Sequence, residues 1–199
     1  MAETVGALAI LGPAKALAEA VGDQFHDDCL QRAGIETLPP ADAVVPIAQA
    51  TRLHDCIFDL ADDGAAILRA GGRHSSVIFV KQHYSAFSRA SARLMPHGLA
   101  LRLIGRRMCQ RASAFAGSAE VRMSLFDPIV YEIVDGPFSR GDQVGRLCHW
   151  QAGFLEGVYR QLLHRGYSCD ETACCAEGAK ACRFMLSRDI PSGAGSRAA

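Results

Sequence analysis

The sequence lacks several features that would assign a function directly. No apolar run approaches the roughly 18 residues that a membrane-spanning helix needs, and residues 1–4 lack the basic start of a secretory signal peptide. There is no P-loop and no G-x-G-x-x-G motif between a predicted strand and helix, since Gly193 and Gly195 follow no strand. These absences predict a cytoplasmic protein and provide no motif for a nicotinamide or flavin cofactor.

Acidic residues are missing from the middle of the chain. Residues 64–119 contain nine basic side chains and no acidic one, whereas residues 1–63 contain eleven acidic and three basic side chains. The formal net charge of the 199 residues is nevertheless zero, which argues against a general nucleic-acid-binding protein. The basic segment predicts an anionic ligand, an acidic partner, or pairing with the acidic N-terminal region of the same chain.

The eight cysteines do not form C-x-x-C pairs. Without an export signal, such cysteines favour free thiols and metal binding over disulfides. Cys148 lies on a predicted helix, and Glu171, Cys174 and Cys182 fall in one short downstream segment. Three thiolates and one carboxylate are a complete ligand set for a structural zinc ion, which is closed to water. The alternative is a group of ordinary buried thiols.

The expected secondary structure is helical first and mixed afterwards. Apolar periodicity and breakers predict helices at 13–32, 46–60, 63–70, 99–116 and 144–164, and strands at 120–126, 129–134, 167–175 and 181–187. Gly71-Gly72 is expected to end the third helix, and residues 77–80 are either a strand or the start of a helix. This order predicts an α+β fold in which an antiparallel sheet packs against helices.

The C-terminal motif resembles the 4-vinyl reductase domain family. The resemblance lies in Glu171-x-x-Cys174-x-Ala176-x-Gly178-x-x-x-Cys182-x-Phe184, with Cys148 on the preceding helix, and covers about residues 75–188. It implies zinc bound by Cys148, Glu171, Cys174 and Cys182, although Cys169 or Cys175 could replace one of them. It also implies a fold similar to that of small vesicle-tethering-complex subunits, and a homodimer.

The expected domain organisation follows from the resemblance and the helical pattern. Residues 1–72 form a helical N-terminal region, residues 73–190 a ligand-binding domain with the zinc site, and residues 191–199 a disordered tail. A chain with this organisation, and with no attached ATPase or DNA-binding domain, resembles the stand-alone family members of the bacteriochlorophyll pathway in phototrophic bacteria. The resemblance therefore implies a location in the cytoplasm or at the periphery of the photosynthetic membrane.

The family name implies reduction of a vinyl group, which needs two electrons and two protons. Zinc cannot supply electrons because its d-shell is filled, and three cysteines with one glutamate do not match the usual all-cysteine ligation of an iron–sulfur cluster. Reduction would therefore need electrons from a partner or an unrecognised cofactor site, and whether the protein is an enzyme stays open.

The resemblance also implies a small aromatic or hydrophobic ligand between helices and sheet. Aromatic side chains could stack on a flat macrocycle, and arginines could pair with its propionates, although core packing and a solvated face are the simpler roles of these residues. The candidates are Phe79, Tyr84, Phe87, Arg89, Arg93, Phe126, Tyr131, Trp150 and Phe154. Arg102, Arg106 and Arg107 are further candidates for the propionates, and His83 or His97 for an axial ligand to magnesium.

Three functions follow from these expectations. The first is binding and delivery of a tetrapyrrole intermediate, Mg-protoporphyrin or divinyl protochlorophyllide, between pathway enzymes such as Mg-chelatase or a methyltransferase. The second is a 4-vinyl (8-vinyl) reductase that acts on divinyl protochlorophyllide with partner-supplied electrons. The third is a docking or assembly subunit, as the resemblance to vesicle-tethering subunits implies.

Overall fold

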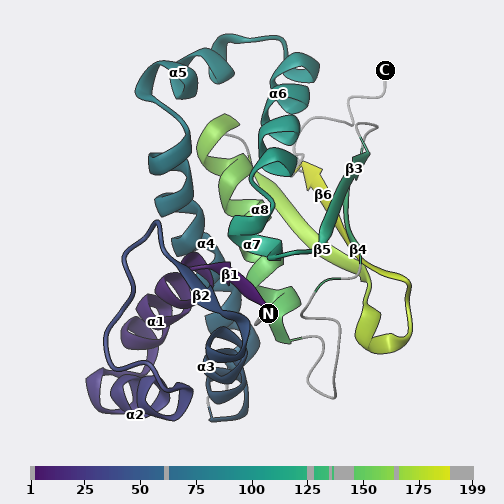
Figure 1. Cartoon of the computed structure of the whole chain (residues 1–199). Coiled ribbons are helices and arrows are strands. Elements are labelled where there is room, and N and C mark those ends of the chain that lie inside the picture. The colour runs from purple at the N-terminus through teal and green to yellow at the C-terminus, as the bar shows by residue number, and fades with distance from the viewer. Residues whose placement is uncertain are drawn as a thin grey trace, which may run out of the picture.

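The computed structural model describes residues 3–60, 63–124, 128–134, 136, 146–163 and 166–188 (Figure 1). Its helices are α1 (Leu8–Val21), α2 (Asp23–Ala33), α3 (Ile47–Leu60), α4 (Gly64–His83), α5 (Ala86–Leu94), α6 (His97–Gln110), α7 (Ser113–Ala116) and α8 (Arg146–Leu163), with a 3-10 turn, η2, at Cys175–Glu177. Its strands are β1 (Thr4–Gly6), β2 (Val44–Pro46), β3 (Glu120–Ser124), β4 (Ile129–Val134), β5 (Tyr167–Ala173) and β6 (Ala181–Arg188).

Four strands form one antiparallel sheet in the order β3-β4-β6-β5. Buried and half-buried side chains alternate along β4, as expected for a sheet with one face in the core. α8 packs on this sheet, and the Tyr131 and Tyr159 hydroxyls lie 2.7 Å apart across the contact. The predicted α+β class, with an antiparallel sheet packed against helices, is confirmed, whereas the likeness to vesicle-tethering subunits stays a prediction.

The prediction that Gly71-Gly72 ends a helix was wrong, because α4 continues through both glycines. A Cβ on Gly71 would lie 2.7 Å from Cα of Pro13 in α1, and one on Gly72 would lie 2.8 Å from the carbonyl carbon of Gly153 in α8. The glycines therefore allow α1 and α8 to approach α4 closely, and this packing outweighs the low helix propensity of glycine. Residues 77–80 lie inside α4, and so does the predicted domain boundary between 72 and 73.

Other element boundaries also moved. The helix predicted at 13–32 is divided at Gly22, where φ is 83°, and the one predicted at 99–116 is divided after Gln110. The small β1–β2 sheet and helix α5 were not predicted. The predicted tail, residues 191–199, lies outside the described residues. Among the described residues, no helix is both long enough and apolar enough to cross a membrane.

Candidate metal centre and ligand cavity

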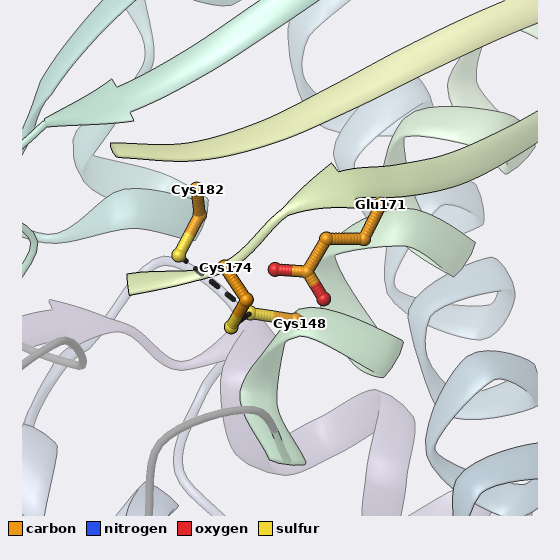
Figure 2. Close-up of side chains that lie close together, drawn as sticks. All are labelled: Cys148, Glu171, Cys174 and Cys182. Carbon is orange, nitrogen blue, oxygen red and sulfur yellow. Dashed lines mark hydrogen bonds between the residues drawn. The ribbon is translucent and has the colours of Figure 1, made fainter. Parts of the chain in front are cut away.

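The four predicted metal ligands lie together where α8 meets the β5–β6 hairpin (Figure 2). Cys148 lies in the first turn of α8, Glu171 in β5, Cys174 just after β5, and Cys182 in β6. The η2 turn and Gly178, which has a φ of 88°, reverse the chain between the two strands. Because this turn brings the ends of β5 and β6 over α8, residues from two distant segments face one point.

The spacing of the ligand atoms fits a tetrahedral ion. The Cys148 sulfur lies 3.8 Å from the sulfurs of both Cys174 and Cys182, and one ligand atom from each of the four residues lies within 4.8 Å of the others. Two sulfurs that are each about 2.3 Å from a tetrahedral zinc ion are about 3.8 Å apart. The cluster could therefore hold a metal ion of this size without large movement of the chain.

The three thiols are almost fully buried, with exposed fractions of 5% for Cys148, 6% for Cys174 and 7% for Cys182. Burial raises the pKa of Cys174 to about 12, whereas the hydrogen bond donated by Cys148 lowers the pKa of Cys182 to about 6. Without a cation these sulfurs therefore share their protons unequally. A metal ion among them would favour the thiolate form of all three.

Glu171 supplies an independent indication. Figure 2 shows its carboxylate directed toward the three sulfurs. Its Oε1 atom is buried and has no hydrogen-bond partner among the described residues. A buried oxygen without a partner is costly, so it needs a ligand, a water molecule or an ion. Coordination of a metal would satisfy this atom.

The two alternative cysteines lie outside this group. Cys169 is fully buried in β5, and its carbonyl oxygen accepts a hydrogen bond of 2.6 Å from Arg69. Cys175 is half-buried, and its backbone N–H donates to the Cys182 sulfur at 3.4 Å. Cys175 thus lies beside the cluster and contributes a backbone donor to one of its sulfurs.

Four of the predicted ligand-binding aromatics are core residues. Phe79, Trp150 and Phe154 belong to one packed group, in which the Phe154 ring lies 5.2 Å from Phe79 and 5.8 Å from Trp150. Tyr131 is fully buried against Tyr159. Phe126 lies outside the described residues.

Tyr84 and Phe87, in contrast, line a cavity of about 440 Å³ between α5 and α6. Apolar side chains and two arginines complete its wall, and the lining residues are Tyr84, Phe87, Ser88, Ser91, Ala92, Met95, Ala100, Leu103, Ile104, Arg106, Arg107 and Gln110. The volume is within the range of small-molecule sites. Most of this wall was not predicted from the sequence because α5 was not. The one local signal of α5 is its cap at Ser85, which accepts a hydrogen bond from the Ser88 N–H at 3.1 Å.

The polar chemistry of this cavity centres on Tyr84. Its hydroxyl is buried and has no hydrogen-bond partner among the described residues, and its ring lies 5.3 Å below the Arg107 guanidinium. Burial raises the pKa of Tyr84 to about 12, so the hydroxyl stays protonated near neutral pH. The cavity thus offers a hydrogen-bond donor, two cations and an apolar wall.

Arg89 and Arg93 face a different hollow, a groove of about 620 Å³ that Lys81, Arg160 and Gln161 also line. Arg93 donates a 3.1 Å hydrogen bond to the Gln161 carbonyl across this groove. The structure therefore divides the predicted ligand residues among the core, the α5–α6 cavity and this basic groove.

The two candidate axial histidines lie outside the α5–α6 cavity. The His83 ring packs 4.6 Å from Phe79, and burial with nearby Arg111 and Arg107 lowers its pKa. His97 Nε2 lies 3.2 Å from the Tyr167 hydroxyl. Neither histidine lines the cavity that contains Tyr84.

Comparison with known proteins agrees with the motif. Over 188 residues, the chain is 29% identical to the bacteriochlorophyll synthase 23 kDa chain of Cereibacter sphaeroides, covering 94% of this chain and 91% of that protein. It is 26% identical to the protein of the same name from Rhodobacter capsulatus, covering 92% and 86% of the two chains.

Solved structures with a similar fold include H-NOX proteins. The Shewanella oneidensis H-NOX protein in its Fe(II)NO state has a TM-score of 0.62 and 11% identity, covering 94% of this chain and all of that chain. A Cs H-NOX variant has a TM-score of 0.61 and 14% identity, covering 94% and 98%. At these identities the likeness concerns the fold alone.

The family model of the 4-vinyl reductase domain matches residues 129–188, which extend from β4 through α8 to the end of β6. This segment contains all four residues of the cysteine–glutamate cluster. The resemblance inferred from the motif is therefore confirmed, and the chain contains a domain of the 4-vinyl reductase family.

Proposed function

We propose that this protein binds a tetrapyrrole intermediate of bacteriochlorophyll biosynthesis, such as Mg-protoporphyrin or divinyl protochlorophyllide, in the α5–α6 cavity. The names of both relatives support the pathway. Solved structures with this fold include studies of haem and porphyrin distortion, which supports a fold that accommodates a tetrapyrrole. The observation that carries the proposal is the buried, unpartnered Tyr84 hydroxyl, among the described residues, in an apolar cavity with two arginines.

Each part of the cavity has a role in this proposal. Phe87, Leu103 and Ile104 would contact the apolar macrocycle, since aromatic rings pack well against flat π-systems. Arg106 and Arg107 would pair with a propionate, because a guanidinium binds a carboxylate through two parallel hydrogen bonds. The Tyr84 hydroxyl would donate to an oxygen of the ligand and so gain the partner that it lacks among the described residues.

Zinc in the cluster of Cys148, Glu171, Cys174 and Cys182 is a second part of the proposal. The 3.8 Å sulfur spacings and the unpartnered Glu171 oxygen support it. Four protein ligands leave no position for a catalytic water, so the ion would be structural and would tie α8 to the β5–β6 hairpin. The expected homodimer stays a prediction.

Titration with Mg-protoporphyrin, followed by Soret absorbance, tests the binding proposal. We expect saturable binding near one pigment per chain, and weaker binding after Tyr84→Phe or Arg107→Gln. Arg32→Gln on α2 is the matched control, because this exposed arginine lies outside the cavity. Absence of binding at micromolar pigment, with metal analysis normal, would refute the proposal.

The reductase alternative is separated by a second assay. The purified protein is incubated anaerobically with divinyl protochlorophyllide and NADPH, and the products are separated by chromatography. A carrier returns the divinyl compound unchanged. Formation of the monovinyl product by the protein alone would overturn the carrier function and would require a reductant site that the sequence motifs do not reveal.

A further inference from the structure

Large apolar side chains are exposed together on α5 and α6. The exposed fractions are 82% for Phe87, 89% for Leu94, 48% for Leu99 and 49% for Leu103. In Figure 1 these helices form one end of the molecule, away from the turn between β5 and β6. Single exposed apolar residues are common, but four within 17 consecutive positions form a surface that favours a partner.

Helix α5 has the character of an interfacial helix. It contains no buried residue. Phe87 and Leu94 are seven residues apart and so lie on the same face, whereas Arg89 and Arg93 are four apart and lie on another. A helix with apolar residues on one face and arginines on the other typically lies in the plane of a membrane surface.

The charge of this end of the molecule indicates what the partner must be. α5 and α6 contain five arginines, and no acidic residue occurs from 64 to 119. A second copy placed on the same face would bring like charges together, which opposes a symmetric dimer there. An anionic surface with an apolar interior satisfies both the arginines and the exposed leucines.

We propose that the α5–α6 face docks on a lipid membrane that contains anionic headgroups, with Phe87, Leu94 and Leu99 entering the headgroup boundary and the arginines contacting lipid phosphates. The α5–α6 cavity opens on the same face, because the exposed Phe87 and Leu103 line it. A docked protein would exchange an apolar ligand directly with the bilayer. The docking inference uses exposure and charge alone, so it does not depend on the proposed pigment binding.

Flotation with vesicles of phosphatidylcholine alone, or of phosphatidylcholine with phosphatidylglycerol, tests this inference. We expect binding to the anionic vesicles that falls as salt is raised, because exposed charges are screened. The double variant L94S/L99S should lose at least tenfold in affinity, and Arg102→Gln about fivefold. None of these three residues lines the cavity, so Mg-protoporphyrin titration of the same variants reports pigment binding separately.

The controls are Leu38→Ser, at an apolar residue that is 45% exposed, and Arg32→Gln, both far along the sequence from α5 and α6. Both should bind vesicles as the unaltered protein does, and thermal melting should show that every variant folds. Equal binding to neutral and anionic vesicles, or unchanged binding of L94S/L99S, would overturn the inference. It would also be overturned if the protein ignored both vesicles and L94S/L99S converted a dimer to a monomer in sedimentation experiments.

Discussion

Tyr84→Phe should make the ligand-free protein more stable while weakening its affinity for ligand. The hydroxyl lies in a buried position without a partner among the described residues, so folding desolvates it without a hydrogen bond in return. Removing an unsatisfied buried hydroxyl recovers about 1–2 kcal/mol. For a chain of 199 residues that corresponds to a rise in Tm of about 2–8 °C.

The affinity should change in the opposite direction. A hydrogen bond from the Tyr84 hydroxyl to the ligand contributes about 1–1.5 kcal/mol, so its loss weakens binding of Mg-protoporphyrin by roughly five- to twelvefold. The phenylalanine ring keeps the stacking beneath Arg107, which isolates the hydroxyl as the cause. Calorimetric melting of the free protein and a Soret titration measure the two quantities.

Tyr131→Phe is the matched control, because the chemical change is identical and the surroundings differ. The Tyr131 hydroxyl is paired with Tyr159 at 2.7 Å, so its removal leaves a buried group with a weakened network and should destabilise the protein by about 1–3 kcal/mol. If Tyr84→Phe lowers Tm as Tyr131→Phe does, or leaves pigment affinity unchanged, the Tyr84 hydroxyl is not a ligand donor and the reasoning is refuted.

Three other perturbations have defined outcomes. Cys148→Ser should abolish the roughly one metal ion per chain measured by mass spectrometry, whereas Cys169→Ser should retain it, because the Cys169 sulfur lies outside the cluster. Burial lowers the pKa of His54 to about 4, so the unfolded chain binds the extra proton first and stability should fall by about 3 kcal/mol as pH drops from about 6.5 to 4. Chemical denaturation across this range measures the loss, and His54→Gln should flatten it. Gly153→Ala should cost about 1–3 kcal/mol by collision with the Arg69 carbonyl, whereas Gly98→Ala, with open space around it, should be neutral or slightly stabilising.

Each of these outcomes can fail in a distinct way. Metal retention by Cys148→Ser would show that the ion does not need α8. A flat pH profile in the unaltered protein would show that burial does not hold the His54 imidazole neutral beside the Ala9 carbonyl, which lies 2.8 Å from its Nε2 atom. Full stability of Gly153→Ala would contradict the close contact of α4 and α8.

The metal centre could be predicted from the sequence because its evidence is local. Glu171, Cys174 and Cys182 lie within 12 consecutive residues, and a hairpin with a glycine turn brings them together without long-range information. Only Cys148 needed a prediction of tertiary contact, and its place on a strongly amphipathic helix next to the hairpin supplied it. The spacing of the motif, together with the family resemblance, was sufficient.

The cavity could not be predicted in the same way. Phe79, Trp150 and Phe154 are aromatic and periodic like Phe87, and composition cannot separate a core residue from a cavity residue. The difference is made by α4, which the glycine rule ended before Gly71 and which in fact runs on to His83, next to Tyr84. Intrinsic propensity describes an isolated helix, whereas the two glycines of α4 allow its contact with α1 and α8.

The same α4 relates the two candidate sites physically. Near its middle, Gly72 packs against the backbone of α8 close to Trp150, two residues after the Cys148 ligand, and at its C-terminal end it positions Tyr84 in the α5–α6 cavity. A structural ion that fixes α8 therefore also fixes the helix from which the cavity is built. Loss of metal and loss of pigment binding would then be coupled through packing, whereas vesicle docking by the exposed face of α5 would need only that helix and its arginines. The three properties can thus be separated by experiment although one fold carries them all.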